Sequence, residues 1–114
     1  MRLVIAAPAN GAILKDALKA HLQNDPRVSS LVDLSSPEGT YPQLSFAAAE
    51  EVAAGRADRA LLICGTGVGT AIAANKVRGI RAATAHDLLT VRGSVEHYNA
   101  LVLCMGQNVL AAPA

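Results

Sequence analysis

The segment from Leu61 to Lys76 constrains the fold most, because it joins a buried strand to a helix through a glycine-rich loop. The apolar residues 60–63 predict a strand that is buried on both faces and ends at Cys64. Glycines alternate at 65, 67 and 69, where they allow a sharp turn and bring backbone N–H groups close to a ligand. The small residues that follow predict a helix, whose N-terminus favours anions. Ligands bind at the carboxyl ends of strands in open α/β sheets, so a site is expected at Cys64 and Thr66.

The rest of the chain alternates in the same way between strands and helices. Strands are expected over residues 2–6, 28–34, 60–63, 80–85 and 101–105, and helices over 12–22, 42–54, 69–77 and after Asp87. Asn10 is expected to cap the first helix, and Gly93 to weaken or end the last one. This spacing predicts a single domain over residues 1–114. Its fold class would be α/β, a three-layer, doubly wound, five-stranded parallel sheet of Rossmann-like or flavodoxin-like type.

Composition and charge argue against several kinds of partner. Aromatic residues make up 3% of the chain and tryptophan is absent, which removes the stacking platform of single-stranded nucleic-acid binders. The net charge is +1 with no basic run, so neither nucleic acid nor a membrane surface is an expected partner. No apolar stretch approaches the roughly 20 residues of a membrane span, and the N-terminal run is too short for a signal peptide. A cytoplasmic protein is therefore expected.

The final predicted strand, 101–105, is not followed by a predicted helix. One face of this strand would lie open unless another subunit covered it. Because exposed apolar patches usually mark interfaces, the pattern predicts an oligomer.

Two nucleotide-binding motifs resemble the glycine loop but do not match it. A G-x-G-x-x-G fingerprint that begins at Gly65 needs glycine at position 70, where Thr70 stands. The loop also follows the third predicted strand, whereas the fingerprint follows the first. A P-loop is excluded because no Gly-Lys-Ser/Thr follows. A nucleotide cofactor is therefore disfavoured.

Cys64 and His97 each allow a structural and a functional interpretation. Cysteine at a strand end is often a small buried hydrophobe, yet nearby N–H groups and a helix N-terminus would lower the pKa of the Cys64 thiol. Cys104 lies inside an apolar strand and is expected in the core. The two cysteines fit no common zinc pattern. His97 lies in a polar segment before the last strand, where it is either a surface residue or part of a site.

Three segments, 64–69, 72–77 and 79–83, closely resemble the ribose-5-phosphate isomerase B / galactose-6-phosphate isomerase family. Further matches are Tyr41-Pro42, Ala57-Asp58, His86-Asp87, Ser94 and Glu96-His97, so the resemblance covers nearly the whole chain. It implies a flavodoxin-like fold and aldose–ketose isomerisation of a small phosphorylated sugar through a cis-enediolate, without metal or organic cofactor. Because family sites form between two subunits, it also implies a homodimer or homotetramer.

The resemblance also implies a role for each matching residue. Cys64 would remove the proton next to the carbonyl; a second branch uses a carboxylate at the position of Thr70, so this chain is of the cysteine type. The Thr66 hydroxyl and the loop N–H groups would stabilise the enediolate, and His97 would open the sugar ring. The residues expected to bind substrate are Gly65, Gly67, Val68, Gly69, Tyr41 and Asn99.

The chain departs from the family pattern at several positions. Pro8-Ala9 stands where the family has an Asp-His pair, Tyr98 where it has Asn, and Asn108 where it has Arg. The C-terminal helix with further phosphate-binding arginines is missing from the sequence. Three hypotheses remain: an isomerase for a shorter phosphorylated sugar that cannot cyclise, one subunit of a heteromeric isomerase completed by a related chain, and a non-catalytic sugar-phosphate-binding protein.

Overall fold

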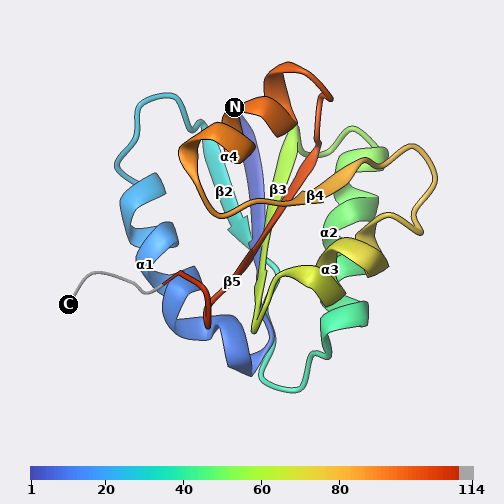
Figure 1. The fold of residues 1–114 in the computed structure, drawn as a ribbon. Coiled ribbons are helices and arrows are strands. Elements are labelled where there is room, and N and C mark those ends of the chain that lie inside the picture. Colours follow the sequence, from blue (N-terminus) through green and yellow to red (C-terminus); the bar gives the residue numbers. More distant parts are fainter. Residues whose placement is uncertain (111–114) are drawn as a thin grey trace.

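A five-stranded parallel sheet organises the computed structural model, which describes residues 1–110 (Figure 1). The domain predicted over 1–114 ends in four residues, 111–114, that lie outside this range. The strands run in the order β2-β1-β3-β5-β4, which confirms the α/β fold class. The elements are β1 (Arg2–Ala6), the 3₁₀ turn η1 (Ala9–Gly11), α1 (Ala12–Leu22), β2 (Ser30–Asp33), α2 (Tyr41–Ala53), β3 (Arg59–Cys64), α3 (Val68–Ala74), β4 (Ala82–Thr84), α4 (Leu88–Glu96) and β5 (Val102–Gly106).

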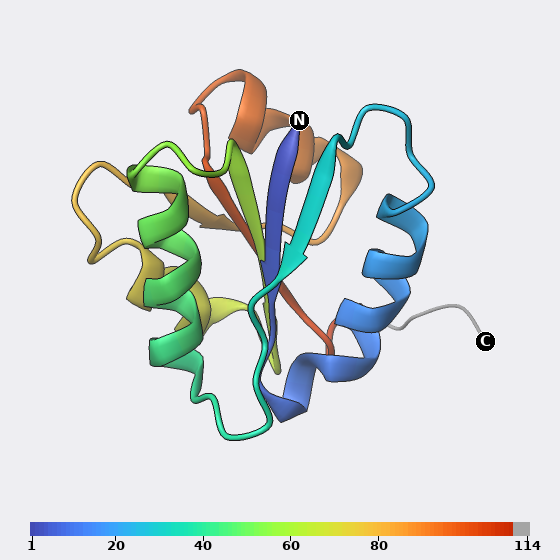
Figure 2. The same ribbon diagram turned by 180° about the vertical axis from the view of Figure 1, so that it is seen from behind.

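Side chains along each strand alternate between two apolar cores. One core lies under α2 and α3 and contains Val4 and Leu62, together with the buried Val102 of β5. The other lies under α1 and contains Ile5 and Ile63. Figures 1 and 2 show α2 and α3 on one side of the sheet and α1 on the other. The layers follow from the alternation of side chains along a strand, since each apolar face must be covered.

The strand order differs from the flavodoxin order 2-1-3-4-5 in one respect: β5 lies between β3 and β4. Burial gives the physical reason, because Val102 and Cys104 of β5 are fully buried while β4 is short and only partly buried. A strand that is apolar on both faces belongs inside a sheet, and a short, partly exposed strand belongs at its edge. The order in which strands are added still reverses between β1 and β3, which places a topological switch point beside β3.

One local prediction was wrong, and another was wrong in one of its two alternatives. Asn10 does not cap α1; it lies in η1, and the N-cap residue is Gly11, without a side-chain cap. Gly93 does not end the last helix, which continues to Glu96 from a cap in which Asp87 accepts a hydrogen bond from the Thr90 N–H at 2.7 Å. Glycine costs only about 1 kcal/mol in a helix interior, so it does not by itself stop a helix that is well capped.

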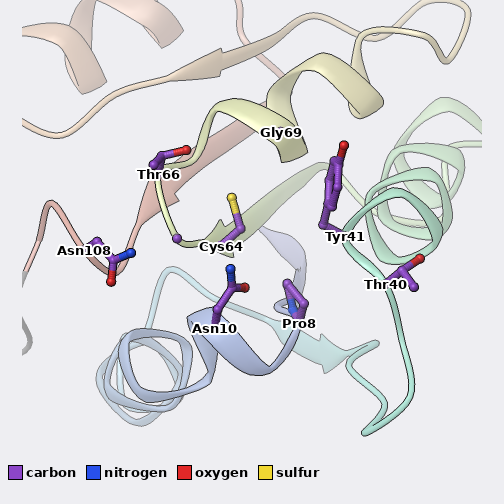
Figure 3. A pocket seen from close by; sticks show the side chains of 9 residues that line it. Pro8, Asn10, Thr40, Tyr41, Cys64, Thr66, Gly69 and Asn108 are labelled. Carbon is purple, nitrogen blue, oxygen red and sulfur yellow. The ribbon is translucent and has the colours of Figure 1, made fainter.

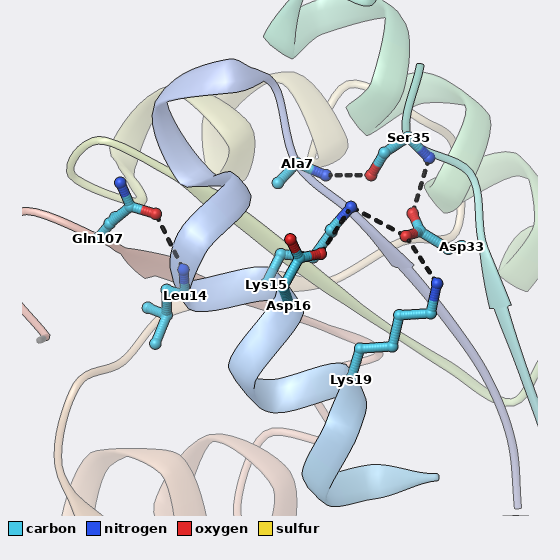
Figure 4. Close-up of polar contacts among 8 residues, drawn as sticks. All are labelled: Ala7, Leu14, Lys15, Asp16, Lys19, Asp33, Ser35 and Gln107. Atoms are coloured by element: carbon cyan, nitrogen blue, oxygen red, sulfur yellow. Dashed lines mark hydrogen bonds and ion pairs between the residues drawn. The ribbon is translucent and has the colours of Figure 1, made fainter. Parts of the chain in front are cut away.

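Asp33, at the end of β2, fastens the segment after β1 to α1 (Figure 4). Its carboxylate lies 2.9 Å from Lys15 Nζ and 3.2 Å from Lys19 Nζ, and it accepts a hydrogen bond from the Ser35 N–H. The Ser35 hydroxyl accepts in turn from the Ala7 N–H at 3.0 Å. Burial acts to raise the pKa of Asp33, but these bonds hold it well below its usual range.

Asp33→Asn is therefore expected to lower the free energy of unfolding by roughly 2 kcal/mol at pH 7, because the largely buried Lys15 ammonium would lose a charged partner. Because the native pKa of Asp33 is lowered, its stabilising effect is complete above the unfolded-state pKa and is lost as the pH falls toward the native pKa. The difference between wild type and variant should therefore begin to shrink below about pH 4 and keep shrinking as the pH falls further. Urea denaturation at neutral and acidic pH measures this. Glu51→Gln, which removes an exposed pair with Arg56, should change stability much less; an equal effect would contradict the prediction.

Helix α4 packs loosely in the isolated chain. None of its residues is buried, and Leu88 and Leu89 are 89% and 83% exposed. These side chains form an exposed apolar surface, but on α4 and not on the face of the last strand that the sequence analysis expected to lie open. The oligomer remains a prediction. Among the residues described, no helix is long and apolar enough to span a membrane.

Candidate active site

A cavity of about 660 Å³ opens at the carboxyl ends of β1 and β3, at the switch point of the sheet (Figure 3). Strands, the start of α2 and the turn after β5 all contribute side chains to it. No charged side chain lines this cavity in the part of the chain that the structure describes. The lining residues are Pro8, Asn10, Thr40, Tyr41, Cys64, Gly65, Thr66, Gly69 and Asn108.

Cys64 ends β3 and points its sulfur into the cavity (Figure 3). Its Sγ accepts a hydrogen bond from the Gly67 N–H at 3.1 Å and lies 3.6 Å from Thr70 Oγ1. Burial acts to raise the pKa of the thiol, but the Thr70 hydroxyl and the backbone N–H groups of Thr70, Gly67 and Thr66 together bring it below its ordinary value. This surrounding favours the thiolate, the form of cysteine that acts as a base or nucleophile.

Cys104 has the opposite character, as the sequence predicted. It is fully buried in β5, and burial raises the pKa of its thiol to about 12. Their surroundings therefore shift the pKa values of the two thiols in opposite directions. Cys104 belongs to the core between the sheet and the helices α2 and α3.

The glycine loop holds its shape by close backbone contacts. Gly67 has a φ of +80°, and a Cβ there would lie 2.9 Å from the carbonyl carbon of Met105. A Cβ at Gly69 would lie 2.9 Å from the ring of Tyr41, so the ring packs directly against the loop. Two loop N–H groups already have acceptors: that of Gly67 donates to the sulfur, and that of Val68 donates to Thr66 Oγ1 at 3.3 Å. The Gly67 N–H is therefore already bonded to the Cys64 sulfur, in addition to any contact that the loop makes with a ligand.

The structure brings most of the predicted site residues together. Cys64, Gly65, Thr66, Gly69 and Tyr41 line the cavity, and Gly67 supports it from the loop. Val68 is the first residue of α3, and its side chain is 51% exposed.

His97 and Asn99 lie far from this cavity within one chain. Asn99 Oδ1 accepts a hydrogen bond from Arg59 Nη2 at 3.4 Å, and Arg59 is the first residue of β3, whereas Cys64 is the last. A six-residue strand spans about 16 Å, so the two groups occupy opposite edges of the sheet. Figure 1 shows α4, which ends just before His97, at the edge opposite the loop between β3 and α3.

Sequence analysis missed the amides of Asn10 and Asn108 as parts of the site. A Cβ at Gly65 would lie 3.2 Å from Nδ2 of each of them, so both amides converge above this glycine. They follow β1 and β5, which are the two neighbours of β3 in the sheet. These two residues could have been found only from the strand order, which the spacing of the elements along the chain does not reveal.

His86 has a structural role: its Nε2 accepts a hydrogen bond from the Gly106 N–H at 2.8 Å. It therefore supports the end of β5. Within residues 1–110, no three His, Cys, Asp or Glu side chains are grouped in a way that would hold a metal ion.

Fold and cavity together define a class of protein. It is an α/β protein with a cavity at the carboxyl ends of its strands, lined by a thiol of lowered pKa and by hydrogen-bond donors that suit a small polar molecule. The chain belongs to the Ribose/Galactose Isomerase family, whose model matches residues 3–113. This confirms the resemblance found in the sequence, and the protein is a sugar-phosphate isomerase of the aldose–ketose type.

Three similar proteins illustrate the relationship. D-erythrulose-4-phosphate isomerase 2 of Mycolicibacterium smegmatis is 52% identical over 114 residues, which cover 96% of this chain and 75% of that protein. The galactose-6-phosphate isomerase subunit LacB of Clostridium acetobutylicum is 49% identical over 69 residues, covering 60% of this chain and 40% of that one. The structure of Clostridium thermocellum ribose-5-phosphate isomerase B superimposes with a TM-score of 0.92 at 35% identity, covering 98% and 76% of the two chains.

Proposed function

We propose that this protein interconverts a four-carbon aldose phosphate and the corresponding ketose phosphate. The observation that carries the proposal is Pro8, which lines the cavity with Cys64 where the family has the first residue of its ring-opening Asp-His pair. An aldotetrose with phosphate on its O4 has no free hydroxyl that could close a five-membered ring, so it needs no ring opening. The erythrulose-4-phosphate isomerase at 52% identity supports the same chain length.

In the proposed mechanism the Cys64 thiolate takes a proton from C1 of the ketose, next to the C2 carbonyl. The electron pair of that C–H bond forms the C1–C2 double bond, and the carbonyl oxygen becomes the oxyanion of a cis-enediolate. The resulting thiol then returns a proton to C2, while the proton of the C1 hydroxyl moves to the C2 oxygen, which yields the aldose. In this mechanism the Thr66 hydroxyl, which lines the cavity, donates a hydrogen bond to the oxyanion.

The test is an isomerisation assay on four-, five- and six-carbon aldose phosphates. We expect the highest kcat/KM on the four-carbon substrate, because Pro8 replaces the first residue of the Asp-His pair that the family uses in ring opening. A higher kcat/KM on ribose 5-phosphate would overturn the assignment of chain length and leave the reaction class in place. A separate test, turnover of the Cys64→Ala variant, shows whether Cys64 is the base.

We also propose that a second copy supplies His97 and Asn99, since in their own chain they lie toward the end of β3 opposite the cavity. The exposed Leu88 and Leu89 supply apolar surface for such a contact. His97→Ala is expected to lower kcat/KM on a five-carbon aldose phosphate about tenfold more than on a four-carbon one, because only the former must open a ring. Equal losses would contradict a ring-opening role, and a monomer by light scattering at micromolar concentration would contradict a shared site.

A further part of the proposal is that Asn10 and Asn108 bind hydroxyl groups of the sugar. An amide both donates and accepts, as a hydroxyl does, and both amides converge on one point above Gly65. Gln107 keeps their segments together, because its Oε1 accepts a hydrogen bond from the Leu14 N–H of α1 at 2.9 Å (Figure 4).

Asn10→Ala and Asn108→Ala should therefore each lower kcat/KM by about tenfold, the usual weight of a lost substrate hydrogen bond. Asn108→Asp distinguishes the ligand group. A carboxylate still accepts from a hydroxyl but repels a phosphate, so a modest effect supports hydroxyl binding. A KM that rises much further in Asn108→Asp than in Asn108→Ala would contradict it.

A second candidate function is that of a subunit which needs a related partner chain. The match to a galactose-6-phosphate isomerase subunit and the lack of a charged side chain among the described lining residues favour it. Under this alternative the purified chain would show no turnover on any of the three sugar phosphates. Addition of the related chain would then restore activity.

A further inference from the structure

The hydroxyl of Thr70 is fully buried beside the sulfur of Cys64, in the first turn of α3. We propose that Thr70 is a positioning residue whose hydroxyl proton turns from the Gly67 carbonyl to the sulfur whenever Cys64 becomes a thiolate. This inference rests on the proposed role of Cys64 as the base, since such a base alternates between thiolate and thiol in every turnover.

Three oxygen atoms and the sulfur form the arrangement. Thr70 Oγ1 lies 3.6 Å from Cys64 Sγ and 3.2 Å from the Gly67 carbonyl oxygen. The same carbonyl accepts a second hydrogen bond, from the hydroxyl of Thr84 in β4, at 2.9 Å. Gly67 also donates its own N–H to the sulfur at 3.1 Å. The Thr70 hydroxyl thus has two possible acceptors but only one proton.

In the thiol form every polar atom has a partner. The Thr70 hydroxyl donates to the Gly67 carbonyl, and its oxygen accepts from the S–H of Cys64. In the thiolate form the hydroxyl turns to donate to the sulfur, which then receives two hydrogen bonds, from Thr70 and from the Gly67 N–H. The Gly67 carbonyl keeps its bond from Thr84, so it is not left unpaired.

The change needs only a rotation about the C–O bond of Thr70, with no movement of heavy atoms. A buried group that loses its partner costs about 1–3 kcal/mol, and the bond from Thr84 avoids that cost. Hydrogen bonds to an ionised acceptor are stronger than neutral ones, so the second donor favours the thiolate. The pKa of the Cys64 thiol lies below its ordinary value, in keeping with this arrangement.

Other titratable groups near the sulfur come from three elements. Cys104 of β5 stays a thiol, because burial raises its pKa to about 12. Tyr41 of α2 lines the same cavity, and His86 after β4 is engaged with the Gly106 N–H. Among the described residues, no charged side chain lines the cavity, so the thiolate there is stabilised by hydrogen bonds.

The experiment compares Thr70→Val with Thr70→Ser in a Cys104→Ala background, so that Cys64 is the one cysteine observed. Valine keeps the shape of threonine and removes the hydroxyl, whereas serine keeps the hydroxyl. Thiolate is followed by its absorbance near 240 nm and by the rate of alkylation with iodoacetamide across pH. Ser45→Ala is the matched control: it removes a fully buried hydroxyl that donates to the Tyr41 carbonyl at 2.6 Å.

We expect Thr70→Val to contain about tenfold less thiolate at a given pH below the midpoint, and Thr70→Ser to titrate like the parent. An unchanged titration in Thr70→Val, or an equal shift in Ser45→Ala, would overturn the proposal. The titration needs no substrate, so it stands apart from the proposed function. If Cys64 is not the base, the alkylation titration shifts in Thr70→Val while the pH profile of kcat/KM does not.

Discussion

Cys64→Ala is expected to lower kcat/KM by about 10³-fold, the loss that follows removal of a positioned general base. The reason is local, because the sulfur at the end of β3 lines this cavity and surrounding donors lower the pKa of the thiol, which suits the proposed base. Alanine fits the same strand end, so the fold should persist. Steady-state kinetics on the preferred sugar phosphate, with circular dichroism and a melting curve, measures both.

Cys104→Ala is the matched control for this experiment. It removes a thiol from the same core, but one whose pKa is about 12 and which does not line the cavity. Its activity should stay within a few-fold of wild type, with stability reduced by roughly 1–2 kcal/mol for the lost core volume. Near-normal turnover in Cys64→Ala would show that the base lies elsewhere.

Gly67→Ala should be the most damaging single-methyl change in the loop, for two physical reasons. A non-glycine residue at its φ of +80° costs about 1–2 kcal/mol. The added Cβ would also lie 2.9 Å from the Met105 carbonyl carbon, and forced overpacking costs about 1–3 kcal/mol more. We expect the free energy of unfolding to fall by roughly 3 kcal/mol, and activity to fall because the Gly67 N–H contacts the sulfur.

Gly79→Ala separates the two causes. Its φ is +85°, close to that of Gly67, but a Cβ there would have nothing within 4 Å. It should therefore lose only the conformational part, about 1 kcal/mol, and keep its activity. Urea denaturation of both variants makes the comparison. Equal losses would show that the contact with β5 carries no weight.

Local patterns in the sequence determined much of this protein. Apolar runs and helical periodicity located the strands and helices. Gly55, which follows the helix predicted over 42–54, has the left-handed φ of +78° that is common just after a helix. The loop from Cys64 to Gly69 also lies where its sequence placed it, at the carboxyl end of β3. These features depend on neighbours along the chain, so spacing is enough to predict them.

Only the tertiary structure decided which distant segments meet. The insertion of β5 between β3 and β4 places Asn108 beside Gly65, opposite Asn10, and leaves His97 and Asn99 at the other edge of the sheet. The contact between Thr70 and Cys64 likewise depends on how α3 packs against β3 and β5. Strand order follows from which apolar faces bury one another best, and this is a property of the whole core that the spacing of residues along the chain does not contain.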